Sequence, residues 1–157
     1  MTSRIIKTSI FAALLLSLSA CSAEASSNGP ERTTVGVIEL AVTHVCARES
    51  DSKCISLDGE QLVLPSTFER AVVDDATVAA EQGPNTVNVI FSDAGTKIFR
   101  EVTEEAAKAG ESARLLIKVD GEIEAAVVVM ETIEDGHTLL DFTPKTAQEV
   151  IELIGRS

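Results

Sequence analysis

The sequence predicts an α+β fold, in which a single two-layer domain has a mainly antiparallel sheet and two helices packed on one face. Short segments of alternating apolar and polar residues are separated by Asp-Gly and Gly-Pro turns, a pattern typical of strands joined as hairpins. Two longer segments carry apolar residues three and four positions apart, as helices do. From residue 86 the order is strand, helix, strand, strand, strand, helix, and one sheet covered on one face would bury these apolar residues.

The first half of the domain predicts strands and hairpins. The segment TTVGVIELAVTHVCAR alternates, and its apolar residues share one side of a strand: Ile38, Leu40, Val42 and Cys46. Asp58-Gly59 lies between CISL and EQLVL and predicts a tight hairpin turn. The segment STFERAVVDD is expected to hold a short helical turn. Gly83-Pro84-Asn85, between ATVAAEQ and TVNVIF, predicts a second hairpin.

The second half of the domain predicts both helices. Ser92 is the expected N-cap of DAGTKIFREVTEEAAKA, and Gly110 is its expected C-terminal stop. The second helix is expected to begin at Thr143-Pro144, with the threonine as N-cap and the proline at the first helical position. Its apolar stripe consists of Ala147, Val150, Ile151 and Ile154. Between the helices, ARLLIKVD and EIEAAVVVM flank an Asp-Gly turn and HTLLDF follows, which predicts three further strands.

The beginning of the chain predicts export. Residues 1–20 combine Arg4 and Lys7 with a short apolar run and small residues, which is the pattern of a secretory signal peptide. The apolar run is shorter than the ~20 residues that span a bilayer. The sequence LSAC at residues 18–21 resembles the bacterial lipobox, and the resemblance implies that Cys21 becomes the first mature residue and carries lipid. An ordinary signal peptide, with Cys21 incidental, is the alternative.

The predicted mature protein is a tethered domain. Residues 21–34 are small, polar and unpatterned, as a flexible tether should be, and residues 35–157 form the domain. Lipid chains on Cys21 would hold this domain to a membrane, on the periplasmic side of the cell envelope. Ser22, rather than aspartate, follows the cysteine. By resemblance to proteobacterial lipoproteins, this favours the outer membrane if the cell is Gram-negative.

Net charge argues against one class of partner. The 157-residue chain has a formal net charge of −12 at pH 7, and loss of the two basic residues in the signal peptide would make it −14. An acidic surface repels nucleic acid. The chain also has no Trp and no Tyr on which bases could stack. No nucleic-acid partner is therefore expected.

The two remaining cysteines, Cys46 and Cys54, flank the segment ARESDSK. In an exported protein, two nearby cysteines are expected to form a disulfide. The alternative is a metal site that also uses His44, two residues before Cys46 and so on the same face of a strand. Structural zinc sites take four ligands, so three candidates favour the disulfide. Neither a metal nor a cofactor is expected.

The second half of the chain resembles a known family. The segments that carry the resemblance are VNVIFSDAGTKIFREVT, ARLLIKVDGEIEAAVVV, IEDGHTLLDF and FTPKTAQEVIELI. They resemble the head subdomain of the first periplasmic domain of SecD and SecDF, the accessory subunit of the bacterial protein-export channel. The family usually has proline where this chain has Ala126, and its membrane helices do not follow here. The resemblance implies a fold and an envelope protein or exported polypeptide as partner, but not a translocation motor.

No group of residues in the sequence predicts catalysis. His44 and His137 belong to no metal or nucleophile motif, and no phosphate-binding loop occurs. The adjacent acids Asp74-Asp75, Glu104-Glu105 and Glu134-Asp135 are interpreted as solvated surface. The leading hypothesis is a non-catalytic binding or interaction module of the cell envelope, related to protein export and not an enzyme. The alternative is a small periplasmic hydrolase that uses dispersed carboxylates.

Overall fold

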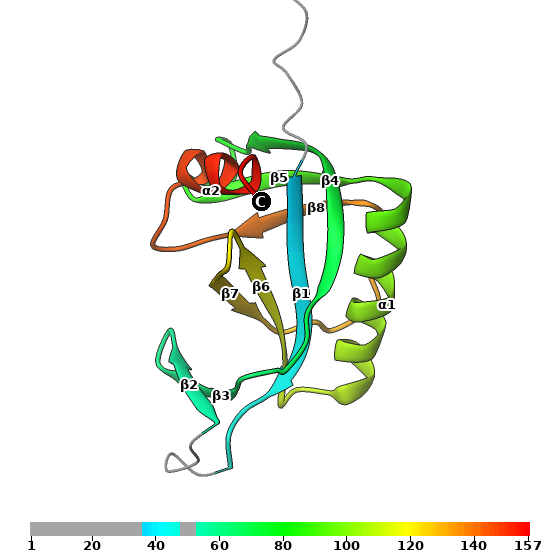
Figure 1. The fold of residues 1–157 in the computed structure, drawn as a ribbon, viewed down its shortest axis with the longest axis vertical. Coiled ribbons are helices and arrows are strands. Elements are labelled where there is room, and N and C mark those ends of the chain that lie inside the picture. The colour runs from blue at the N-terminus through cyan, green and yellow to red at the C-terminus, as the bar shows by residue number, and fades with distance from the viewer. Residues whose placement is uncertain (1–35, 48–52) are drawn as a thin grey trace, which may run out of the picture. The chain divides into compact units, whose positions relative to one another are not determined.

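A computed structural model describes residues 36–47 and 53–157. Their main element is a curled six-stranded sheet with the order β7-β6-β1-β4-β5-β8 (Figure 1). Its strands are β1 (Gly36–His44), β4 (Glu69–Val78), β5 (Thr86–Phe91), β6 (Ala113–Val119), β7 (Glu122–Val127) and β8 (His137–Asp141). Every pairing in this sheet is antiparallel. A separate ribbon pairs β2 (Cys54–Leu57) with β3 (Glu60–Val63).

The two helices, α1 (Asp93–Ala109) and α2 (Ala147–Ile154), pack onto one apolar core. The sheet contributes buried residues that include Ile38, Leu40, Val89 and Ile117. The helices add Phe99, Val102, Ala106, Ala147, Val150 and Ile154. Burying each large apolar side chain contributes roughly 1.5–3 kcal/mol, which makes this cluster the main stabilising feature of the domain. The predicted α+β fold, with helices on one face of a mainly antiparallel sheet, is confirmed.

The β2–β3 ribbon contacts β1 outside this core. Leu62 of β3 is completely buried, and its backbone forms a bridge with that of Val45. The Thr43 hydroxyl donates to the Val63 carbonyl. Ala41 and Thr43 are buried on the side of β1 opposite Leu40. The predicted side of β1 is confirmed as far as Val42, which packs against the main core with Ile38 and Leu40, but the predicted one-sided burial is wrong because Ala41 and Thr43 are buried as well.

The helical turn predicted within STFERAVVDD is also wrong, because most of this segment belongs to β4. Ala71, Val73 and Ala76 of β4 are buried while their neighbours are largely exposed, which is strand periodicity. The first half of β4 pairs with β1 and the second half with β5, with a register shift between Val73 and Asp75. Long-range pairing on both sides thus outweighs the local helical preference.

The hairpin predictions are confirmed, at Asp58-Gly59 between β2 and β3 and at residues 83–85 between β4 and β5. Helix α1 also begins as predicted, because the Ser92 hydroxyl accepts from the backbone N–H of Gly95 at 3.1 Å. Gly110 follows the last turn of α1 with a φ of 83°, a conformation that favours glycine.

Helix α2 begins later than predicted. Its N-cap is Thr146, which forms a capping box with Glu149, and not Thr143. The Thr143 hydroxyl instead donates to Asp141 at 2.7 Å and accepts from the Asn85 amide at 3.1 Å. Residues 143–145 therefore lie before the helix, and its buried stripe is reduced to Ala147, Val150 and Ile154.

Candidate functional site

Of the predicted site residues, the structure describes the cysteine pair. Cys46 and Cys54 form a disulfide with an S–S distance of 2.03 Å and a Cα–Cα distance of 6.4 Å. Cys21 and the predicted signal peptide and tether lie outside the described residues. The disulfide connects the segment after β1 to the start of β2, so it belongs to the attachment of the β2–β3 ribbon.

An ion pair also holds the ribbon to the sheet. The Arg114 guanidinium of β6 donates to both carboxylate oxygens of Glu60, at 2.8 and 2.7 Å. This two-point contact lowers the pKa of Glu60 and raises the pKa of Arg114. The disulfide and this ion pair thus both attach the β2–β3 ribbon to the rest of the domain, which gives them a structural role.

A groove opens at the two edges of the sheet. Strands β7 and β8 are at opposite ends of the strand order, yet only the 128–136 segment separates them in the chain. Nine extended residues reach at most about 30 Å, so the sheet must curl to bring these edges toward each other. The space left between them has a volume of about 290 Å³. Its apolar wall comprises Phe99, Leu115, Val127, Val129, Ile133 and Leu140.

The rim of this β7–β8 groove is unusually apolar for a surface. The exposed fractions of Val128, Met130 and Leu139 are 45%, 75% and 49%. The charged residues that line the groove in the described part of the chain are the acids Glu131 and Asp141. Exposed apolar residues that gather at a groove are typical of sites that bind another molecule.

The 128–136 segment is held by residues on one face of helix α1. The buried Thr103 hydroxyl donates to the Arg100 carbonyl at 3.0 Å and accepts from the Ile133 amide at 3.2 Å. The Arg100 guanidinium lies 3.8 Å from the Glu134 carboxylate. Gly136 approaches the helix so closely that a Cβ there would lie 2.1 Å from the Thr96 hydroxyl. The 128–136 segment, which forms part of the groove wall, is therefore attached to α1 at several points.

The outer edge of β8 supplies free backbone groups. In the described part of the chain, β8 is the last strand of the sheet and pairs with β5 alone. The Phe142 amide donates to the Asn85 carbonyl, so the even-numbered residues of β8 bond to β5. The N–H and C=O groups of His137, Leu139 and Asp141 consequently point away from β5, toward the open edge.

Asp141, the last residue of β8, is held in place by hydrogen bonds from Thr143. Its carboxylate accepts from the Thr143 hydroxyl at 2.7 Å and from the Thr143 amide at 3.1 Å. These hydrogen bonds hold the pKa of Asp141 below its usual value, with a smaller contribution from Thr86. Asp141 is therefore a fixed negative charge at neutral pH, beside the exposed Leu139.

The two histidines lie apart from each other. His137 is exposed on β8, and its Nε2 contacts the Asn88 side chain of β5. His44 is exposed at the end of β1. Within residues 36–47 and 53–157, no three or more His, Cys, Asp or Glu residues are grouped so as to hold a metal ion.

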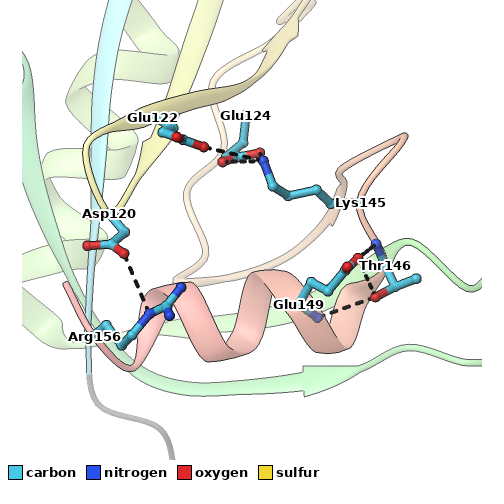
Figure 2. A network of polar contacts seen from close by, with 7 residues as sticks. All are labelled: Asp120, Glu122, Glu124, Lys145, Thr146, Glu149 and Arg156. Carbon is cyan, nitrogen blue, oxygen red and sulfur yellow. Dashed lines mark hydrogen bonds and ion pairs between the residues drawn. The ribbon is translucent and has the colours of Figure 1, made fainter.

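The adjacent acids are mainly surface residues with separate partners. Glu104 lies four residues before Lys108 on α1 and pairs with it, Glu134 pairs with Arg100, and Asp74 is exposed. The most buried carboxylate described is that of Glu124, which receives Lys145 in the network beside α2 (Figure 2). Its partner neutralises it, so this pair joins β7 to the segment that leads into α2.

Sequence reasoning missed the β7–β8 groove. The apolar run AAVVVM was read as a return strand, but β7 ends at Val127. Val128 and Met130 are instead exposed beyond it. A usable signal was the length of this apolar run, which continues through Met130, three residues past the end of β7.

These features define the class of the protein as a small α+β domain with an open sheet edge and an apolar groove. Its fold is similar to that of SecDF. A structure of SecDF, described as a membrane component that enhances protein export, matches with a TM-score of 0.49 and 21% identity, over 79% of this chain and 63% of that one. SecDF in a Super-membrane-facing form matches with a TM-score of 0.50 and 20% identity, over 80% of this chain and 19% of that one.

The likeness concerns the fold alone. This chain spans less than two thirds of either SecDF chain. No protein-family model matches the sequence, and no curated protein matches it. Among the helices of the described residues, none has the length and apolar character needed to cross a membrane.

Proposed function

We propose that this protein is a lipid-anchored protein of the cell envelope that binds polypeptides in connection with protein export and does not catalyse a reaction. The observation that carries the proposal is the β7–β8 groove, where Val128, Met130 and Leu139 remain exposed around an apolar cavity. An exported polypeptide before folding exposes apolar side chains, and a groove of this chemistry suits them.

The fold likeness supports the link to export. SecDF is described as a membrane component that enhances protein export, and a SecDF structure has a similar fold over 80% of this chain at a TM-score of 0.50. Function is attached to a site rather than to a fold, so this support is by analogy. In this chain, the β7–β8 groove is the site to which we assign polypeptide binding.

The proposed location follows from the start of the sequence. The signal-like residues 1–20 and the LSAC sequence favour export and lipid attachment at Cys21, which would anchor the domain on the periplasmic side of a membrane. Residues 21–34 would allow the domain to move relative to that membrane. An outer-membrane location is favoured in a Gram-negative cell.

Site-specific photo-crosslinking in living cells tests polypeptide binding. A photoreactive residue at position 130, on the rim of the groove, should crosslink to newly exported polypeptides labelled by a short radioactive pulse. The same residue at the exposed position 97 of α1 is the matched control. Crosslinks to pulse-labelled chains should disappear when protein synthesis is stopped. Equal crosslinking from both positions, or none from position 130, would contradict the proposal.

A further inference from the structure

We infer that the β7–β8 groove binds its polypeptide as an added strand along β8, and that it selects segments in which apolar and basic residues alternate. This inference rests on the proposed function and specifies the mode of binding and the chemistry of the partner. Three observations carry it: the unpaired backbone of β8, the two different sides of that strand, and the acidic lining of the groove.

The backbone of β8 is ready to pair. His137, Leu139 and Asp141 direct their N–H and C=O groups away from β5, at an edge that no other strand of the described chain covers. An extended peptide laid along this edge would satisfy these groups with a continuous ladder, as in β-strand addition. The side chains of Val128 and Met130 lie across the groove and would contact the other side of such a peptide.

The two sides of β8 impose an alternating pattern on the added strand. Leu140 is buried on the inner side and continues into the apolar wall with Phe99 and Leu115. His137, Leu139 and Asp141 are exposed on the outer side, where the apolar Leu139 lies between two ionisable side chains. Because successive side chains of a strand point to opposite faces, every second residue of the peptide would enter the apolar groove and the others would face solvent.

The acidic residues at the groove determine which side chains suit the solvent-facing positions of the added peptide. Glu131 and Asp141 line the groove, and the exposed Glu134 and Asp135 follow nearby in the 128–136 segment. The chain as a whole carries a net charge of −12. Lysine or arginine at the outward positions would therefore be attracted, whereas aspartate or glutamate would be repelled. A second copy of this acidic chain is disfavoured for the same reason.

Five end-blocked, fluorescent nine-residue peptides test the inference on the full chain, with affinity measured by fluorescence anisotropy. One alternates Val and Lys, one alternates Val and Glu, and one has the Val and Lys residues in two blocks. The fourth and fifth are the alternating Val–Lys peptide N-methylated at the Val positions and at the Lys positions, respectively. We expect the alternating Val–Lys peptide to bind about tenfold or more tightly than the other two sequences at low salt, with a preference that falls as salt is added.

The methylated isomers separate backbone pairing from simple apolar attraction. A strand uses the N–H groups of one of its edges, so one isomer should lose binding and the other should retain it. On the protein side, Leu139→Pro removes an N–H that β5 does not use, and it should weaken binding while the domain stays folded. The double substitution Glu131→Gln and Asp141→Asn should remove the preference for lysine. Glu101→Gln, on the exposed face of α1, is the control and should leave binding unchanged.

The outcomes distinguish this inference from the function on which it rests. If all peptides bind alike and both methylated isomers bind equally, the inference is wrong while polypeptide binding stands. If Glu101→Gln weakens binding as much as the groove variants do, the peptides bind a non-specific acidic surface and the inference is also wrong. If no peptide binds and position 130 gives no crosslinks in cells, the proposed function itself fails.

Discussion

Both oxygens of the Glu124 carboxylate accept from the Lys145 ammonium, at 2.9 and 2.7 Å. The Glu124 side chain is 4% exposed and that of Lys145 is 35% exposed, so the acid is enclosed while the base reaches it from the surface. The pair joins β7 to the segment that leads into α2 (Figure 2). The hydrogen bond from Lys145 to Glu124 raises the pKa of Lys145.

Replacing Lys145 should therefore destabilise the domain. Lys145→Met leaves a buried carboxylate without its partner, and we expect a loss of roughly 1–3 kcal/mol in the free energy of unfolding, measured by chemical denaturation. The loss is smaller than for a fully buried pair because the ammonium is partly solvated. Lys97→Met, at an exposed position of α1, is the control and should have little effect. Adding Glu124→Gln to Lys145→Met should recover part of the loss, and a further large loss would contradict this account.

Asp141 should contribute stability in a defined range of pH. Its pKa is lowered in the folded protein, so its contribution is fully present above the unfolded pKa of about 3.9 and is lost as pH falls through the folded value. Asp141→Asn should thus be less stable than the parent at pH 7, and the difference should vanish under strongly acidic conditions. Thr143→Val, which removes the hydroxyl donor, should reduce the shift in an NMR titration. A difference in stability that stays constant from pH 7 to pH 2 would rule out this role.

Gly95 should not tolerate a side chain. A Cβ at this position would lie 2.2 Å from the Val72 carbonyl oxygen, which is backbone and cannot swing aside. In an unconstrained helix, alanine is more stable than glycine by about 1 kcal/mol. Here we expect Gly95→Ala to lower stability by about 1–3 kcal/mol through overpacking. Ala94→Gly, at the exposed neighbouring position, should lower it by the propensity difference alone. Thermal unfolding of both variants provides the measurement, and a stabilising Gly95→Ala would show that α1 can move off β4.

The Cys46–Cys54 disulfide should form in the exported protein. Intact mass measured after alkylation without reduction should show both thiols protected. Replacing both cysteines with serine should lower the free energy of unfolding by ~2.5 kcal/mol on the chain-entropy model, because the closed loop is short. Two alkylated thiols in material recovered from the cell envelope would overturn this expectation.

Cys21 should carry lipid. In cells, Cys21→Ala should leave the precursor unprocessed or release the protein from the membrane fraction, since the lipid supplies the anchor. Labelling with a radioactive fatty acid should be lost in the same variant and retained in Ser22→Ala. A Cys21→Ala protein that is still processed and lipid-labelled would disprove the assignment.

Local chemistry explains which elements could be predicted. The Asp58-Gly59 turn and the Ser92 cap depend on neighbours a few residues away, and both occur where the sequence places them. The start of α2 was misplaced because Thr143-Pro144 and the Thr146–Glu149 pair are both plausible helix starts. In the structure Thr143 contacts Asn85, far away in the sequence, and the helix begins at the second of these starts.

The candidate site depends on strand order, which local patterns do not reveal. Strands β7 and β8 follow each other in the chain, so a simple meander would have paired them. In the structure they are the two outer strands of the sheet, and the groove exists because they are not paired. The burial of Ala41 and Thr43 on the second side of β1, the strand that the β2–β3 ribbon contacts, could not be predicted from alternation because it also depends on long-range contacts.

An unpaired strand edge is also where copies of a protein can aggregate. Along the outer edge of β8, Leu139 is flanked by the ionisable side chains of His137 and Asp141, and the net charge of −12 repels other copies at neutral pH. Protonation of the carboxylates near pH 4 removes this repulsion while the edge itself remains. Acid should therefore convert a ligand-binding edge into a nucleus for precipitation, and colloidal stability should fall before the fold is lost.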